Sequence, residues 1–270
     1  MRKAFFIGVI LLTGCIFFAG CPRRYDGITI RQGVLLIGID ISYPPMEYFG
    51  PDGITPRGFT VEMAREISER LNLRPEFVNM SWIGIFDGLN ANRYDVIISS
   101  VTVTPARQLV HNFSKPYFVN PLVMVRLRDG NITAQSPEEL EGLDVGFQGG
   151  TTSEFFMANL AAETGMAFRP RGYDQIIRAF DDLRLGRLHT IITDLVVAYH
   201  YTAMPNSPFE IVWRHYEEPE FFAICLRKGN DELTYAINRV LEEMFDDGTM
   251  LRISYEILGM DLVTEARQTW

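Results

Sequence analysis

The chain has 270 residues, of which 47% are hydrophobic and 22% charged, and its formal net charge is −9. This length is sufficient to bury the core of one or two domains, and the composition is that of an ordinary globular protein. The negative charge, with no stripe of basic residues, argues against nucleic acid or an anionic bilayer surface as the main partner.

The first element is a targeting segment. Arg2 and Lys3 precede the apolar run AFFIGVILLTGCIFFAG, which suits a secretory signal better than a membrane span. A small-residue pair before Cys21 resembles the lipobox of bacterial lipoproteins, so residues 1–20 are predicted to be a signal peptide and Cys21 to be lipidated. Cys15, in LTGC, is the alternative, although cleavage there would leave IFFAG on the mature chain. An uncleaved anchor is a further alternative; in each case the protein is exported and tethered.

Past a predicted tether at residues 21–33, strand and helix patterns alternate. Buried strands are expected at 34–40, 76–81 and 94–100, and helices at 60–71, 83–92 and 105–113. Thr60 is the expected N-cap of the first helix, and Thr104-Pro105 predicts the start of the third. The segment 115–127 is extended and interrupted by proline, which favours a crossover between units over a central strand.

A second series of the same kind follows. Strands are expected at 144–148 and 189–194, helices at 151–165, 173–186 and 195–204, an extended segment at 220–229, and helices with a break near Gly248 over 231–259. Two runs of β-α units, each able to build a small parallel sheet, predict an α/β fold with two lobes. The expected boundaries are 34–118 plus 222–270 for lobe 1 and 119–221 for lobe 2, with hinge strands at about 115–125 and 217–226.

Several kinds of chemistry find little support. Cys225 is the one cysteine after the targeting segment; it lies in the apolar run FFAICL, which predicts a small core residue, with a reactive role as the alternative. His111, His189, His200 and His215 lack the spacing of metal ligands, and no GxSxG motif is present. We therefore expect no metal, no cofactor and no catalytic residue.

Polar residues gather where the predicted strands end. In open parallel α/β sheets, ligands bind beyond the carboxyl ends of the strands. The residues at these ends are Asp40 and Tyr43, Ser99, Ser100, Thr102 and Arg107, Gln148, Thr151 and Thr152, and Asp194.

Arg107 falls in the first turn of a predicted helix, where the helix dipole already presents positive charge and an anion would be favoured. Thr151 to Glu154 resembles a capping box after two glycines, which exposes backbone amides to an anion. Arg107 and Thr152 can thus grip a carboxylate from two sides, and Asp194 can hold an ammonium group, as an α-amino acid requires. The alternatives are an exposed arginine, a well-capped helix and an aspartate that caps the next helix.

A series of stretches in fixed order is similar to one family. They are LLIGIDISYPPMEY, GFTVEMAREISERLNL, SWIGIFDGLNANRYDVII, TVTPAR, FSKPY, VGFQGGTTSEF, ITDLVVAY, LRKGNDEL and DDGTMLRISYEILG. Over nearly all of residues 34–259 the sequence resembles the solute-binding proteins of polar amino-acid ABC transporters, the bacterial extracellular family 3. The resemblance implies a periplasmic-binding-protein-like (type II) fold with a hinged cleft between the lobes.

The resemblance also implies roles for single residues. Arg107 would bind the ligand carboxylate, helped by amides at Thr102 and Thr152, and Asp194 would bind the α-ammonium together with Ser100. By position, the remaining residues would line the same site: Trp82 would stack over the ligand side chain, Tyr43 would form a wall, Asp40 would contact a polar side chain, and Ser99, Gln148 and Thr151 would complete the set. The alternatives are a core aromatic for Trp82 and a structural cap for Asp40. Met46 and Thr60 depart from the phenylalanine and aspartate usual in the family, which affects side-chain specificity only.

The implied function is high-affinity binding of a polar L-amino acid and its delivery to the permease and ATPase of an ABC transporter. Asp40 favours a ligand with a side-chain donor, such as lysine, arginine, histidine or glutamine. A sensory receptor subunit and an enzyme resembling cyclohexadienyl dehydratase are the alternatives. The expected protein is a non-catalytic monomer, periplasmic or at the cell surface, that meets the membrane only through its lipid anchor.

Overall fold

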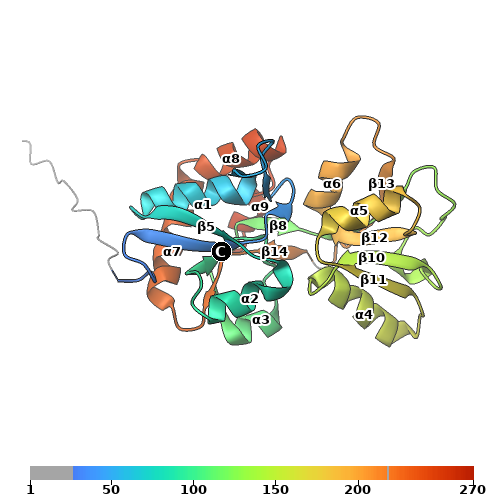
Figure 1. Cartoon of the computed structure of the whole chain (residues 1–270), viewed down its shortest axis with the longest axis horizontal. Helices are drawn as coiled ribbons and strands as arrows, with labels where there is room; N and C mark the ends of the chain where they lie inside the picture. The colour runs from blue at the N-terminus through green and yellow to red at the C-terminus, as the bar shows by residue number, and fades with distance from the viewer. Residues whose placement is uncertain (1–26, 218) are drawn as a thin grey trace, which may run out of the picture.

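The computed structural model describes residues 27–217 and 219–270, which form two lobes, each built on a five-stranded sheet. Figure 1 shows the two lobes side by side, with α1, α2 and α7 in one and α4, α5 and α6 in the other. The fold class predicted from the sequence, a two-lobe α/β protein, is confirmed.

The sheet of lobe 1 has the order β5-β1-β6-β15-β7. Its strands are β1 (Val34–Ile39), β5 (Arg74–Asn79), β6 (Val96–Ile97), β7 (His111–Phe113) and β15 (Cys225–Arg227). Strand β1 is buried along its whole length and pairs in parallel with β5 and β6, whereas β15 is antiparallel to its neighbours. Cys225 is fully buried in β15, as expected of a core residue.

Helices cover this sheet because their apolar residues recur on one face. In α1 (Phe59–Arg70), the buried Phe59, Met63 and Ile67 follow one another at four-residue spacing. The other helices of lobe 1 are α2 (Trp82–Asn90), α3 (Pro105–Val110), α7 (Asp231–Asp246), α8 (Thr249–Leu258) and α9 (Thr264–Arg267). A small antiparallel sheet of β2 (Ser42–Tyr43), β3 (Glu47–Phe49) and β4 (Pro56–Arg57) precedes α1.

The sheet of lobe 2 has the order β11-β10-β12-β9-β13. Its strands are β9 (Leu122–Leu127), β10 (Asp144–Gln148), β11 (Arg169–Tyr173), β12 (Thr190–Asp194) and β13 (Phe209–Arg214). The short 3₁₀ helix η1 (Pro137–Glu139) and the helices α4 (Thr152–Thr164), α5 (Ile176–Arg184) and α6 (Leu195–Thr202) complete the lobe. Strand β10 is parallel to β11 and β12, whereas β9 is antiparallel to β12 and β13.

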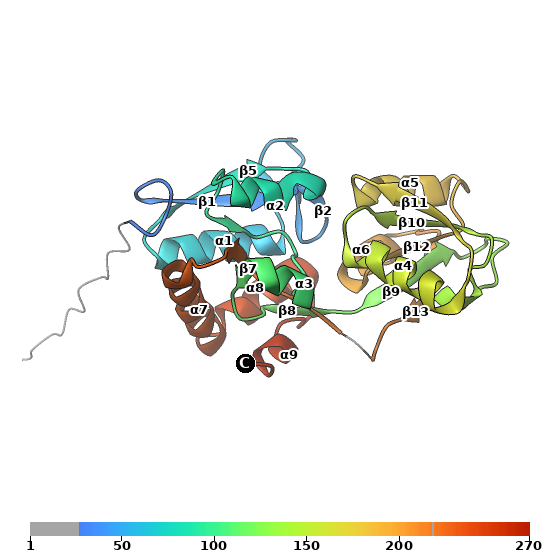
Figure 2. The same cartoon turned by 90° about the horizontal axis from the view of Figure 1, so that it is seen from below.

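The chain crosses between the lobes in two extended segments, which Figure 2 shows between the two bodies. Strands β8 (Phe118–Asn120) and β14 (Glu220–Phe222) lie in these segments and pair antiparallel. The indole of Trp270 donates a hydrogen bond of 2.8 Å to the carbonyl oxygen of Pro116, just before the first crossing.

Several expectations about single elements are wrong. Residues 122–127 form an interior strand rather than only a crossover, because both prolines precede the strand and Leu122 to Val125 are buried in the sheet. Both sheets are mixed rather than parallel. The helix expected over 105–113 ends at Val110, where β7 begins. Thr60 does not cap α1, since the N-cap is Gly58 and the Thr60 hydroxyl donates to the Met46 carbonyl and lies 2.7 Å from the Glu47 carboxyl group.

The predicted signal peptide (1–20), the lipidation at Cys21 or Cys15 and the first part of the tether lie outside the described residues. Within residues 27–217 and 219–270, no helix combines the length and the apolar character that a membrane span requires.

Candidate functional site

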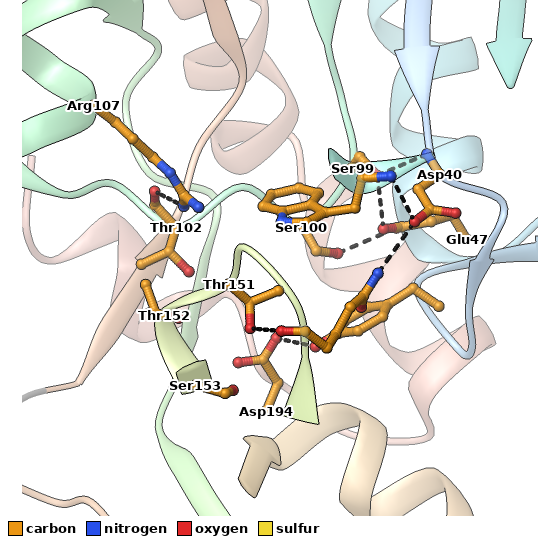
Figure 3. Close-up of a pocket in the computed structure, with 13 residues that line it drawn as sticks. Asp40, Glu47, Ser99, Ser100, Thr102, Arg107, Thr151, Thr152, Ser153 and Asp194 are labelled. Carbon is orange, nitrogen blue, oxygen red and sulfur yellow. Dashed lines mark hydrogen bonds between the residues drawn. The ribbon is translucent and has the colours of Figure 1, made fainter. Parts of the chain in front are cut away.

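A cavity of about 390 Å³ lies between the lobes and is lined by thirteen residues, shown in Figure 3. Eleven of them are the residues that the sequence places at the ligand: Asp40, Tyr43, Trp82, Ser99, Ser100, Thr102, Arg107, Gln148, Thr151, Thr152 and Asp194. The other two, Glu47 and Ser153, were not anticipated.

Parallel strands explain why residues so far apart in sequence meet. Asp40 follows β1, Ser99 and Ser100 follow β6, Gln148 ends β10 and Asp194 ends β12. The carboxyl ends of these strands face the cleft, two from each sheet, so their polar residues converge on one space. Figure 3 shows Asp40, Ser99 and Glu47 on one side of this space and Thr151 and Asp194 on the other.

Arg107 is the cation of the pocket. Thr104 caps α3 by accepting a hydrogen bond of 3.2 Å from the Arg107 amide, which fixes the first turn. The guanidinium donates to the carbonyl of Thr102 (2.9 Å) in lobe 1 and to that of Gly150 (3.5 Å) in lobe 2. These bonds use two of its five N–H donors. Burial lowers the pKa of Arg107, yet an arginine remains charged at neutral pH.

Asp194 is a buried carboxylate at the junction of β12 and α6. Its side chain makes no capping bond to α6 and instead accepts a hydrogen bond from the Tyr43 hydroxyl of lobe 1. Burial, followed by the negative charge of Glu220, raises the pKa of Asp194 well above that of an ordinary aspartate. A cation placed beside Asp194 would offset both effects by favouring the charged form.

Asp40 and Trp82 form the opposite part of the pocket. The Asp40 carboxylate accepts hydrogen bonds from the Ser42 hydroxyl (2.7 Å), the Trp82 amide (3.2 Å) and the Gln148 side-chain amide of lobe 2 (3.2 Å). Burial raises the pKa of Asp40. The Trp82 indole donates to the Gly150 carbonyl at 3.0 Å, and its ring lies 5.3 Å from the Arg107 guanidinium. Trp82 therefore belongs both to the core of lobe 1 and to the pocket wall.

Glu47 lies at the base of the pocket and is 1% exposed. Its carboxyl group lies within hydrogen-bonding distance of the hydroxyls of Ser99 and Ser100, each at 3.2 Å, and of Thr60 at 2.7 Å. Burial raises the pKa of Glu47 to about 8, above the ordinary value of 4.5. The one signal in the sequence is an acidic residue in the apolar stretch PPMEYF, which does not by itself point to a pocket.

We expect Glu47→Gln to flatten the dependence of stability on pH. Between pH 4.5 and about 8, the folded protein keeps a proton on Glu47 that the unfolded chain has lost. Raising the pH through this window therefore lowers the free energy of unfolding, by up to about 1.4 kcal/mol per pH unit for one proton. Urea unfolding of wild type and variant across this window measures the difference.

The exposed Glu69 on α1 provides the control, because Glu69→Gln should leave the pH dependence unchanged. Identical slopes for wild type and Glu47→Gln would contradict the assignment of a buried proton to Glu47.

The capping box expected at Thr151 to Glu154 is only half formed. Thr151 is the N-cap of α4, but its hydroxyl donates to the Gln148 carbonyl at 2.7 Å rather than accepting from the helix. The Glu154 carboxylate does reach back, to the Gly150 amide at 2.6 Å. These two hydrogen bonds fix the turn between β10 and α4. The Thr152 hydroxyl donates to Glu220 at 2.9 Å.

Metal binding has no support in the part of the chain that the structure describes. No group of three or more histidine, cysteine, aspartate or glutamate side chains there is arranged to hold a metal ion. The pocket carboxylates are instead satisfied by hydroxyl and amide donors.

Comparison with known proteins points in one direction. A model of the bacterial extracellular solute-binding proteins, family 3, matches residues 35–260. An L-cystine-binding protein of Escherichia coli is 29% identical over 232 residues, which cover 86% of this chain and 85% of that protein. A probable amino-acid ABC transporter-binding protein of Haemophilus influenzae is 30% identical, with 97% and 99% covered. The solved structure of an ancestral arginine-binding protein bound to glutamine is similar with a TM-score of 0.78 and 34% identity, covering 85% of this chain and all of that one.

Proposed function

The chain belongs to the bacterial extracellular solute-binding proteins of family 3, and from this premise we propose that it captures a polar L-amino acid outside the cytoplasmic membrane and delivers it to the permease and ATPase of an ABC transporter. Closure of the two lobes over the ligand is the motion that this architecture provides. The relatives named for cystine and for amino-acid transport support the same function.

One observation carries the proposal: a half-buried guanidinium from lobe 1 and a buried carboxylate from lobe 2 line the same cavity. Arg107 would take the α-carboxylate through its remaining donors, and Asp194 would take the α-ammonium. Because each lobe holds one of the two groups, an α-amino acid would bridge the lobes and favour the closed form. Trp82 and Tyr43 would form the walls around the side chain.

The charge of the pocket bears on the ligand's side chain. Three carboxyl groups, those of Asp40, Glu47 and Asp194, line the cavity with a single arginine. Glu47 is held neutral by burial at neutral pH, so Asp40 is left over once a zwitterion has paired with Arg107 and Asp194. This surplus favours a ligand with a side-chain donor, among which arginine, lysine, histidine and glutamine are our candidates.

Asp40→Asn should therefore change the preference among ligands more than it changes folding. Asparagine can keep its oxygen toward the Trp82 amide and turn its NH2 group toward the Ser42 hydroxyl oxygen, but it removes the charge. We expect the affinity for arginine or lysine to fall by roughly tenfold relative to that for glutamine, which corresponds to about 1.4 kcal/mol. Calorimetric titration of both proteins with glutamine and arginine measures this ratio. An unchanged ratio would remove Asp40 from the side-chain site.

The proposal also covers the oligomeric state of the protein, its attachment to the membrane and the choice between transport and sensing. We expect a non-catalytic monomer held at the membrane by a lipid on Cys21, which the lipobox-like sequence before this cysteine supports. The intact set of amino-acid contacts favours capture over turnover of a substrate. A sensory role would share the same pocket, and genes for a permease and an ATPase beside this one would distinguish transport from sensing.

The proposal is tested by a thermal-shift screen of the twenty amino acids on protein freed of ligand by unfolding and refolding. At least one polar amino acid should raise the melting temperature in a concentration-dependent way, since a ligand that binds only the folded state stabilises it. Absence of a shift with all twenty would contradict the proposed function.

A further inference from the structure

Glu220 is a half-buried carboxylate that the proposed ligand contacts do not use. It is the first residue of β14, in the second segment that crosses between the lobes. A single carboxylate oxygen, Oε2, accepts hydrogen bonds from the Thr102 hydroxyl at 2.8 Å and from the Thr152 hydroxyl at 2.9 Å. Thr102 lies in the segment between β6 and α3, and Thr152 is the first residue of α4. One oxygen atom therefore joins lobe 1 to lobe 2.

Glu220 approaches the two threonines from outside the ligand pocket. It lines a second, larger cavity of about 1760 Å³, and Thr102, Arg107 and Thr152 line both cavities. Figure 3 shows Thr102 and Thr152 next to each other below Arg107, where a ligand carboxylate would be held. With their hydroxyls directed to Glu220, the threonines would offer such a ligand their backbone amides.

The groups around Glu220 have opposing effects on the ionisation of its carboxylate. Arg107 and His215 face the carboxylate and favour its ionised form, whereas burial and the nearby carboxylate of Asp194 oppose it. Two donors on one oxygen of an ionised carboxylate form stronger hydrogen bonds than neutral pairs would. Burial has the largest effect and raises the pKa of Glu220, and the hydrogen bonds from the Thr102 and Thr152 hydroxyls act against this shift.

We propose that Glu220 is an interlobe latch, a positioning residue whose bonds to Thr102 and Thr152 stabilise the closed cleft from behind the ligand pocket. Any hinge motion that separates the two threonines breaks at least one of these bonds, so the contact is specific to the closed form. The latch raises the population of closed protein before a ligand binds and slows release afterwards, because a contact made in only one of two states shifts the balance toward that state.

Other interlobe bonds are less suited to this role. Tyr43 bonds Asp194, Gln148 bonds Asp40 and Trp82 bonds Gly150, but each pair involves side chains that line the ligand pocket. A bound ligand would compete for or rearrange those groups. Glu220 itself does not line that pocket, although its partners Thr102 and Thr152 do, so its substitution tests closure while every pocket-lining side chain is kept.

The latch is tested first without any ligand, so the result does not depend on the proposed function. Small-angle X-ray scattering of refolded, ligand-free full-length protein would compare wild type with Glu220→Ala and Glu220→Gln. The radius of gyration should increase most for the alanine variant and less for glutamine, whose amide oxygen can still accept both bonds but without the charge that strengthens them. Glu217→Ala, at an exposed position three residues earlier, should match wild type. Thermal unfolding establishes that each variant is folded. If Glu220→Ala does not fold, the radius of gyration of Glu220→Gln alone tests the latch.

A second measurement follows ligand release. With L-arginine as the probe, or with L-glutamine if arginine does not bind, stopped-flow tryptophan fluorescence should show release about tenfold faster from Glu220→Gln than from wild type, as expected for the loss of about 1.4 kcal/mol. If no amino acid binds, the proposed function fails while the scattering still decides the latch. Equal radii of gyration for wild type and both Glu220 variants would overturn the proposal.

Discussion

Replacing Arg107 by alanine is expected to lower the affinity for the amino-acid ligand by about 100-fold or more, which corresponds to roughly 3 kcal/mol. The ligand carboxylate would remain in a closed cavity without its cation, and the cost of leaving a buried charge unpaired adds to the loss of the bond. Arg107 also reaches lobe 2 through the Gly150 carbonyl, so its removal weakens closure as well.

Two variants make this prediction specific. Arg107→Lys keeps the charge but loses the planar fork of donors, so its affinity should fall between those of wild type and alanine. Arg93→Ala, at an exposed position in the same lobe, should bind as wild type does. Calorimetric titration supplies the affinities, and urea unfolding shows whether the variants retain their stability. Full affinity in Arg107→Ala would exclude Arg107 from the binding site.

Asp194→Asn is expected to cause a loss of similar size and to change how binding depends on pH. Burial and the charge of Glu220 raise the pKa of Asp194, so part of the ligand-free protein is protonated there near neutral pH. An α-ammonium group requires the ionised carboxylate, so binding should release a proton and affinity should rise as the pH is raised toward the pKa of Asp194. Asparagine cannot ionise, so the Asp194→Asn variant should lose the proton release and the part of the pH dependence that Asp194 contributes.

Titrations of wild type and Asp194→Asn in buffers of different ionisation enthalpy, between about pH 5 and about pH 8, measure the proton release directly. Asp181→Asn, at an exposed position on α5, is the matched control and should behave as wild type does. An asparagine variant that binds with wild-type affinity and releases the same number of protons would contradict the role of Asp194.

The gathering of the pocket residues could be predicted because it follows from topology. Asp40, Ser100, Gln148 and Asp194 each end or follow a strand that periodicity identifies, and parallel strands bring their carboxyl ends to one edge. Arg107 could be placed in the first turn of α3 because Thr104-Pro105 marks a helix start. Both arguments depend on local sequence alone.

Glu47 and Glu220 could not be predicted in the same way. Glu47 lies in a short strand after a loop, and its place at the pocket depends on how α1 packs against that loop through Thr60. Glu220 lies in a crossing segment, where its contacts depend on the relative position of the two lobes. The Thr60 hydroxyl bonds to the Met46 carbonyl, and the Thr151 hydroxyl bonds to the Gln148 carbonyl at the end of β10, so neither hydroxyl caps a helix.

Strand β11, at the edge of the lobe 2 sheet, could not be predicted from the sequence either. Residues 169–173 are largely exposed and carry two arginines and a proline, so they lack the apolar alternation that marks a strand. They form β11 because β10 offers them a parallel partner and because Arg169 and Arg171 pair with Asp144 at its start. Long-range pairing outweighs local preference here.

The central claim is that one cavity holds both the α-carboxylate and the α-ammonium of a polar amino acid. The most direct measurement is calorimetric titration of refolded, ligand-free protein with the amino acid that gives the largest thermal shift, with its α-carboxamide and with its analogue lacking the α-amino group. We expect tight binding of the amino acid, micromolar or better, and a loss of about 100-fold or more for each analogue. Equal affinity for the amino acid and either analogue would contradict the account.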